Sequence, residues 1–200
     1  MNLNIGSKVH KSGDKIVVEV LRFPTHICVK EKKRTPAKHV KVNGQQIYSG
    51  LHYQTRAVLV TKLREALMKE FVKHFEPFTE ELENMIPLEI SMEWHVPPNW
   101  ETVRFSSVKE VLLWKPIKEG KKYKGLFDAD NQWFWIKTFT DCISKDMGLI
   151  PEDNVPIVPI NGRIKHVPVK HMDDRKLVFI VEKIQDVEHI NLLKKYYEYE

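Results

Sequence analysis

Hydrophobic and polar residues alternate most regularly in residues 88–96. The hydrophobic positions there are Leu88, Ile90, Met92, Trp94 and Val96, each separated from the next by one polar residue. Successive side chains of a strand point to opposite faces, so this pattern predicts a strand with one buried face. A second strand is predicted from Lys15 to Phe23, where a run rich in valine ends at Pro24.

Two other segments repeat their hydrophobic residues every three or four positions, which predicts helices. The first runs from about Tyr53 to Phe75, and its stripe consists of Val60, Leu63, Leu67 and Phe71. The second follows Asp130-Asn131, which can cap a helix, and runs to Gly148, a typical stop. Its stripe consists of Trp135, Phe139, Ile143 and Met147. The first stripe is expected to pack against a sheet.

Two further strands are expected near the C-terminus, at Ile164 to His171 and Lys176 to Glu182. A turn at residues 172–175 would join them as a hairpin, and a terminal helix is expected within 185–200. The order of elements predicts one α/β (α+β) domain over residues 1–200, with a mixed β-sheet and helices packed on one of its faces.

Three segments predict loops or turns. Residues 30–41 are basic and are expected to form a loop, and Asn43-Gly44 is expected to form a turn. Residues 97–127 open with two prolines and are expected to form an elaborated loop, with a short strand near 111–114.

The composition is that of an ordinary globular protein, with 42% hydrophobic and 30% charged residues. No apolar run approaches the roughly 20 residues that span a bilayer, and the first residues lack the apolar stretch of a secretory signal. A cytoplasmic protein without membrane association is therefore expected. Cys28 and Cys142 lie far apart and outside any metal-binding spacing, which argues against a disulfide framework and a zinc site.

Charge is segregated along the chain, although the net charge is only +5. Residues 1–75 hold 15 Lys/Arg against 5 Asp/Glu, and residues 101–127 hold 7 against 3. Residues 76–100 hold 0 against 6, and residues 128–160 hold 2 against 6. Basic segments can bind a phosphate polymer while carboxylates hold a hydrolytic metal, so this pattern suits a nuclease. Solvated loops of accidental composition are the alternative.

Two carboxylates are expected to converge at Asp128 and Asp130, where a loop enters the second helix. In extended backbone, residues two apart point to the same side, and such a pair attracts a hard cation such as Mg²⁺. Taken alone, both residues also fit turn or helix-cap roles. A third acid, Asp153, can join them only if the chain from Gly148 doubles back or a following strand runs beside the helix, because a helix of about 17 residues is roughly 25 Å long.

The segments DADN (residues 128–131) and GLIPEDN (residues 148–154), with a lysine-bearing helix between them, resemble the RusA-type Holliday junction resolvases. These are small endonucleases of phages and prophages. Residues 43–56 resemble that family's turn, tyrosine and helix start, and the strand that ends at residues 96–98 resembles the one before its acidic motif. Residues 173–175 and the following strand resemble its closing hairpin, so the resemblance covers roughly Lys15 to Ile184.

The resemblance implies a RusA-like fold and a Mg²⁺-dependent endodeoxyribonuclease, with Mn²⁺ as a substitute ion. Its substrate would be a Holliday junction or related branched DNA. Asp128, Asp130 and Asp153 would be metal ligands, Glu152 the weaker partner of Asp153, and Lys137 a catalytic source of positive charge. Because a four-way junction is nearly two-fold symmetric, paired cuts imply a homodimer. The expected location is the cytoplasm of a bacterium or of a phage-infected host.

Two departures from the family pattern matter. The family's lysine follows the second aspartate by four residues, where this chain has Phe134, and Lys137 lies three residues further on. These positions are about 60° apart on a helix, so Lys137 is the candidate for the catalytic lysine. The second departure is an insert at about 99–127, whose candidate DNA contacts are Lys121, Lys122 and Lys124.

Other interpretations stay open. The displaced lysine also fits a branched-DNA-binding protein that has lost catalysis, and the insert fits a nuclease specific for flaps or forks. The acids could instead be surface charge on a phage structural or interaction protein. Tyr48 and Arg56 are candidate DNA contacts or residues that frame a helix start. Trp133 and Trp135 could stack on unpaired bases or belong to the core.

Overall fold

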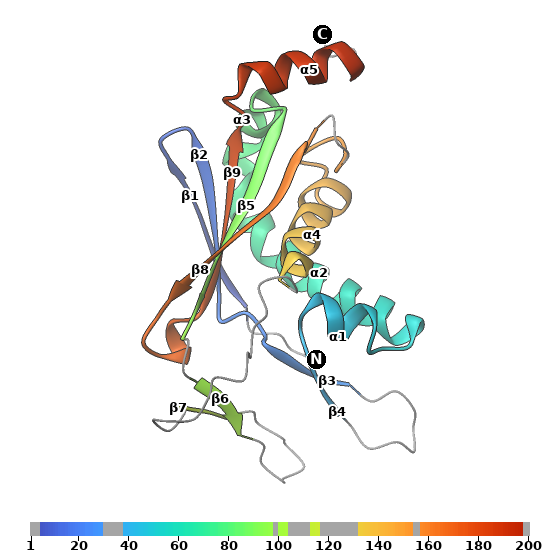
Figure 1. Cartoon of the computed structure of the whole chain (residues 1–200), viewed down its shortest axis with the longest axis vertical. Coiled ribbons are helices and arrows are strands. Elements are labelled where there is room, and N and C mark those ends of the chain that lie inside the picture. Colours follow the sequence, from blue (N-terminus) through green and yellow to red (C-terminus); the bar gives the residue numbers. More distant parts are fainter. Residues whose placement is uncertain are drawn as a thin grey trace.

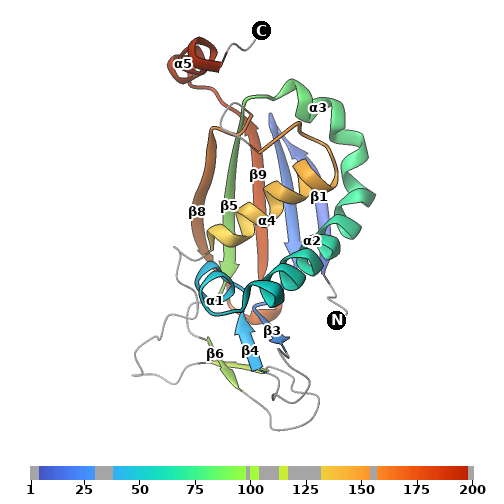
Figure 2. The same cartoon turned by 90° about the vertical axis from the view of Figure 1, so that its right-hand side faces the viewer.

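The computed structural model describes residues 5–29, 38–97, 100–103, 113–116, 132–153 and 157–197. They form a single α+β domain built on a five-stranded mixed sheet with the strand order β1-β2-β9-β5-β8 (Figure 1). The strands are β1 (Gly6–Ser12), β2 (Lys15–Leu21), β9 (Lys176–Lys183), β5 (Leu88–Val96) and β8 (Ile160–Pro168). Two main helices, α2 (Tyr53–Phe75) and α4 (Trp133–Asp141), lie across one face of the sheet (Figure 2).

The strand predicted over residues 88–96 is confirmed as β5. Its five hydrophobic side chains are at most 3% exposed, and the polar ones between them are half-buried on the opposite face. β5 pairs antiparallel with β9 and parallel with β8. The hairpin expected from the last two strands is therefore wrong, because β5 lies between β8 and β9.

Both predicted helices pack against the sheet. The buried residues of α2 are Leu59, Leu63, Leu67, Phe71 and Phe75, whereas Val60, expected in this stripe, is only half-buried. In α4, the ring of Phe139 stacks on Phe179 of β9 at 4.3 Å and meets Phe71 of α2 edge-on at 5.7 Å. These contacts hold α4 against both the sheet and α2.

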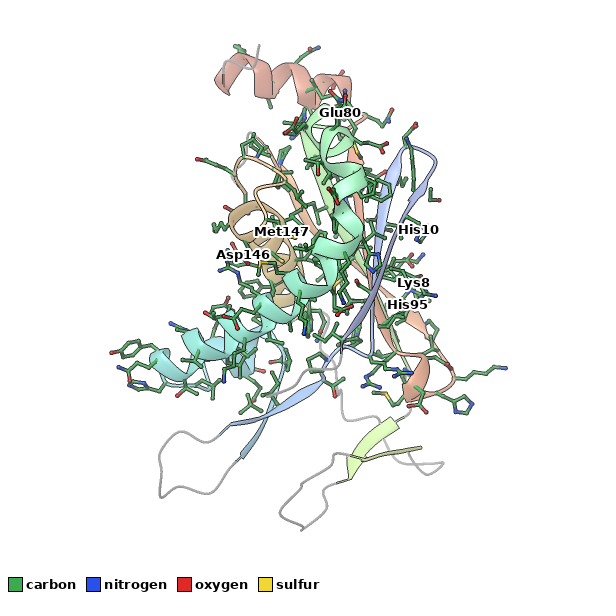
Figure 3. The ribbon with its side chains drawn as sticks, turned by 180° about the vertical axis from the view of Figure 1, so that it is seen from behind. Lys8, His10, Glu80, His95, Asp146 and Met147 are labelled. Carbon is green, nitrogen blue, oxygen red and sulfur yellow. The ribbon has the colours of Figure 1, made fainter. Side chains whose placement is uncertain are left out.

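The second helix ends close to the expected stop at Gly148, but its N-cap and its last turn differ from the prediction. Its N-cap is Gln132, while the expected caps Asp130 and Asn131 lie outside the described residues. At its other end it continues into a π-helical turn, η3 (Cys142–Asp146), in which the Met147 amide donates to the Cys142 carbonyl five residues back. Figure 3 shows Asp146 and Met147 here, on the helix side of the sheet.

The N-terminal part contains elements that the pattern did not predict. Strand β1 precedes β2 and turns into it at Gly13, which has a φ of +62°. The turn expected at Asn43-Gly44 is wrong, because Asn43 instead caps a short helix, α1 (Gly44–Tyr48), with its side-chain oxygen accepting from the Gln46 amide at 2.8 Å. Strands β3 (His26–Val29) and β4 (Lys38–Lys41) pair antiparallel, so the expected basic loop at 30–41 is strand in its last four residues.

The remaining elements lie at the ends of the sheet. They are η1 (Glu76–Phe78), α3 (Thr79–Asn84), β6 (Trp100–Val103), β7 (Leu113–Pro116), η4 (Met172–Asp174) and α5 (Val187–Tyr197). β6 and β7 pair antiparallel within the expected insert, most of which lies outside the described residues, and α5 confirms the predicted terminal helix. None of the helices seen in the described residues combines the length and the apolar character needed to cross a membrane.

The sheet face opposite α2 and α4 carries ion pairs between neighbouring strands. Figure 3 shows Lys8, His10 and His95 on this side. The pairs are Lys15–Glu182, Lys176–Glu19, Lys165–Glu93 and Arg163–Glu89. Because the acids of this face each meet a cation on the next strand, the face is suited to contact with water.

Candidate functional site

One face of α4 and the π turn carries charged residues at intervals of four. Lys137 and Asp141 lie on α4, and Lys145 lies in the π turn. Residues four apart on a helix are neighbours, so these three form one row. The core face of the same helix includes Phe134, Trp135 and Phe139, which are 0% exposed. Core packing therefore fixes the row in place and turns it away from the sheet.

The chain returns to this row after the π turn. Gly148 has a φ of +63°, a backbone conformation that glycine adopts without strain. Leu149 and Ile150 are then buried, and the Leu149 amide donates a 2.8 Å hydrogen bond to the Ile143 carbonyl. This anchor brings Asp153 back beside the helix, so the chain reversal that Asp153 required is present.

Asp153 completes a cluster of two lysines and two aspartates, here called the quartet (Lys137, Asp141, Lys145 and Asp153). The Lys145 ammonium donates to Oδ1 of Asp141 at 2.7 Å and to Oδ2 of Asp153 at 3.2 Å. The Nζ of Lys137 lies 3.6 Å from the same Asp141 oxygen and 3.9 Å from the same Asp153 oxygen. Both carboxylates thus converge on both ammonium groups, and the four charges sum to zero.

The acids of the quartet are more buried than its lysines. The side chains of Asp141 and Asp153 are 11% and 27% exposed, against 45% for Lys137 and 51% for Lys145. The hydrogen bond to Asp141 raises the pKa of Lys145. Burial favours a higher pKa for Asp153, but the hydrogen bond from Lys145 and the charges of both lysines outweigh it and lower that pKa. The net direction of each pKa shift favours the charged forms of Lys145 and Asp153.

An aromatic pair joins the start of α4 to α1. Tyr48 stacks on Trp133 with ring centres 5.3 Å apart, and the Arg56 guanidinium lies 5.4 Å from the Tyr48 ring centre. Burial raises the pKa of Tyr48, the charge of Asp141 raises it further, and Arg56 opposes both. The two candidate DNA contacts Tyr48 and Arg56 therefore lie together, and the charge of Asp141, a member of the quartet, acts on Tyr48. Trp133 is 41% exposed, whereas Trp135 belongs to the core.

The position at which the resembling family has its lysine is buried in this chain. Phe134 is 0% exposed and meets the rings of Tyr48 and Trp135 edge-on. An ammonium group at this position would face a large desolvation cost. Lys137, by contrast, is half exposed and lies beside Asp153.

Asp128, Asp130, Lys121, Lys122 and Lys124 lie outside the described residues. In the part of the chain that is described, no group of three or more His, Cys, Asp or Glu side chains could hold a metal ion. Of the three candidate metal ligands, Asp153 is the one that lies in this part of the chain. Two carboxylates that converge on one ammonium do fit the donor chemistry of a cation site.

Two members of the quartet were not predicted from the sequence. Asp141 and Lys145 fall on the charged face of a predicted helix, where charged residues ordinarily mean solvation. The sequence held one signal of this cluster. Lys137, Asp141 and Lys145 are spaced by four, and Lys137 and Lys145 are the two lysines of residues 128–160. Comparisons of the chain with family models, with curated proteins and with solved structures found no match.

Proposed function

We propose that the protein is a Mg²⁺-dependent, structure-specific endodeoxyribonuclease with a RusA-like fold, which resolves Holliday junctions or related branched DNA. Asp128, Asp130 and Asp153 would hold the ion. The observation that supports this most is the return of Asp153 to the exposed face of α4, 3.9 Å from Lys137. Asp130 comes only two residues before Gln132, the N-cap of that same helix, in the sequence.

The proposed chemistry is phosphodiester hydrolysis. When bound, Mg²⁺ supplies an activated water and neutralises charge that develops on the phosphate and the leaving oxygen. Asp153 is held in its charged form, as a metal ligand must be. Lys137 presents a half-exposed ammonium beside it, where it can contact a phosphate oxygen and stabilise negative charge in the transition state.

The proposed substrate and assembly follow from the symmetry of branched DNA. A four-way junction presents two equivalent strands, so a homodimer with two sites would make paired cuts. Lys121, Lys122 and Lys124 would contact the DNA backbone, with Tyr48 and Arg56 beside the site. The protein would act in the cytoplasm of a bacterium or a phage-infected host.

One observation favours a second candidate, a branched-DNA-binding protein without nuclease activity. Phe134 fills the family's lysine position and is part of the core. If Lys137 cannot do that lysine's work, binding would remain and cutting would be lost. Specificity for flaps or forks would instead leave metal-dependent cutting intact and change only the preferred DNA.

The test is cleavage of labelled four-way junction, flap and duplex DNA in Mg²⁺, Mn²⁺ or EDTA. We expect junction cuts that need the metal and that fall at least about 10²-fold in Asp130→Asn and Asp153→Asn, since each removes a ligand charge. Asp14→Asn, at the turn between β1 and β2, is the matched control and should cut normally. Junction binding without cutting would favour the second candidate, and no binding to branched DNA would overturn both.

A further inference from the structure

The quartet contains a lysine and an aspartate for which the proposed function has no role. Lys145 is the more exposed of the two lysines and makes the shorter contacts to both acids. Asp141 is the most buried member, and its Oδ1 receives both ammonium groups. A buried acid shared by two exposed cations is an arrangement that holds those cations in fixed positions.

The two acids differ in what they could do if a cation or a phosphate arrived. Asp153 follows the turn at Gly148 and is exposed enough for its carboxylate to meet a ligand from solvent. Asp141 lies within the helix and is nearly enclosed. With Asp153 engaged elsewhere, Lys137 and Lys145 would keep Asp141 as their partner and carry one uncompensated positive charge. That charge would lie at the surface beside the proposed ligand Asp153, where a DNA phosphate would be bound.

We propose that Lys145 contacts a DNA backbone phosphate at this site together with Lys137, and that Asp141 is the positioning residue for both lysines. This inference rests on the proposed function, because it takes DNA as the source of the phosphate. A lysine ammonium suits the role as a compact point charge that needs no fixed planar geometry. The spacing of four on either side of Asp141 lets both ammonium groups reach one carboxylate oxygen.

The first experiment measures junction binding without metal or cutting. In Asp153→Asn, studied in EDTA, the competing charge is removed while the side chain keeps its size. The binding constant is measured at several salt concentrations, and its logarithm is plotted against the logarithm of the salt concentration. The slope of this plot reports the number of phosphate contacts. We expect Lys145→Gln and Lys137→Gln, each added to Asp153→Asn, to reduce the magnitude of this slope by about one.

The matched control is Lys73→Gln in the same background. Lys73 also lies on a helix, is 55% exposed and pairs with one carboxylate, that of Glu70 at 3.0 Å. Its substitution should leave the slope unchanged. A slope that Lys145→Gln does not alter, or alters no more than Lys73→Gln does, would overturn the role of Lys145.

The second experiment tests Asp141 as a positioning residue. Asp141→Asn adds one net positive charge, so junction binding in EDTA should be unchanged or tighter. The rate constant for cleavage at saturating junction in Mg²⁺ should nevertheless fall about tenfold, and Asp141→Glu, which keeps the anion, should recover part of it. Equal losses of binding and cleavage with a lowered melting temperature would show a purely structural role, and an unchanged cleavage rate would also overturn the proposal.

Failure of this inference can be told apart from failure of the proposed function. A wild-type protein that binds branched DNA and cuts it with Mg²⁺ supports the function whatever the slopes show. Slopes that respond to Lys145 in a protein that never cuts support the phosphate contact and reject the nuclease. A protein that does not bind junction DNA rejects both.

Discussion

Replacing Gly44 with alanine tests how α1 is fixed against the start of α4. A Cβ at this position would lie 2.8 Å from Nε1 of Trp133, closer than real Cβ atoms come, and 3.0 Å from Cε2, which is tighter than most real contacts. Alanine is favoured over glycine in a helix by up to ~1 kcal/mol, but overpacking costs about 1–3 kcal/mol. Because the indole is stacked on Tyr48, we expect the clash to dominate and Gly44→Ala to destabilise the protein by about 1 kcal/mol.

Urea unfolding of four proteins measures this effect: wild type, Gly44→Ala, Trp133→Ala and the double variant. Removing the indole should relieve the clash, so Gly44→Ala should be neutral or stabilising in the Trp133→Ala background. The coupling between the two changes should then be about 1 kcal/mol or more. If Gly44→Ala stabilises the wild type as much as it stabilises Trp133→Ala, the close approach of α1 and α4 described above is wrong.

Three other measurements test the core, the open sheet face and the buried thiol. Phe139→Ala should lower the free energy of unfolding by about 3–5 kcal/mol, because it empties the contact between α4 and the sheet; a loss below about 1 kcal/mol in denaturant unfolding would contradict that packing. Burial favours a higher pKa for Glu93, but Lys165 and His95 lower that pKa overall. The folded state therefore binds fewer protons at Glu93 than the unfolded state, and wild-type stability should fall as the pH drops from about 5 toward 3. Glu93→Gln should make this fall in melting temperature less steep, and an equally steep fall would refute the assignment. Burial raises the pKa of Cys142 to about 12, so its thiol should be unreactive in the folded protein at pH 8. In Cys28→Ser protein, an alkylating reagent should therefore label Cys142 only after unfolding. Rapid labelling of the native protein would contradict the burial of Cys142.

Much of the fold was predictable because its central elements have strong periodicity. β5 and α2 were found with nearly their observed bounds, since each buries a regular set of hydrophobic residues against the same core. β1 was missed because it is an edge strand with mostly exposed or half-buried residues, so its sequence carries little alternation. Burial on one face is what makes a strand visible in sequence.

The order of the strands was less predictable than the strands themselves. Consecutive strands joined by a short connection are usually neighbours, and on that basis residues 164–171 and 176–182 were expected to form a hairpin. In the structure β5, far earlier in the sequence, separates them, and the Val169 amide bonds to the Val96 carbonyl where the chain crosses its end. Neither the periodicity of a segment nor its turn residues indicate which distant strand will lie between two others in the sheet.

The candidate site also depends on how the chain folds back in space, so the sequence could indicate only some of its residues. Asp153 was singled out by resemblance, but its position depends on how the chain turns at Gly148 and on Leu149 and Ile150 entering the core. The apolar residues that make those contacts do not indicate where the acid that follows them will lie. Lys145 was missed because it lies on a charged helix face, where most lysines contact only water. Asp141, four residues earlier on the helix, is its first acidic partner, and the buried residues after the π turn bring Asp153 back as the second. A core contact therefore changes the electrostatics of this surface.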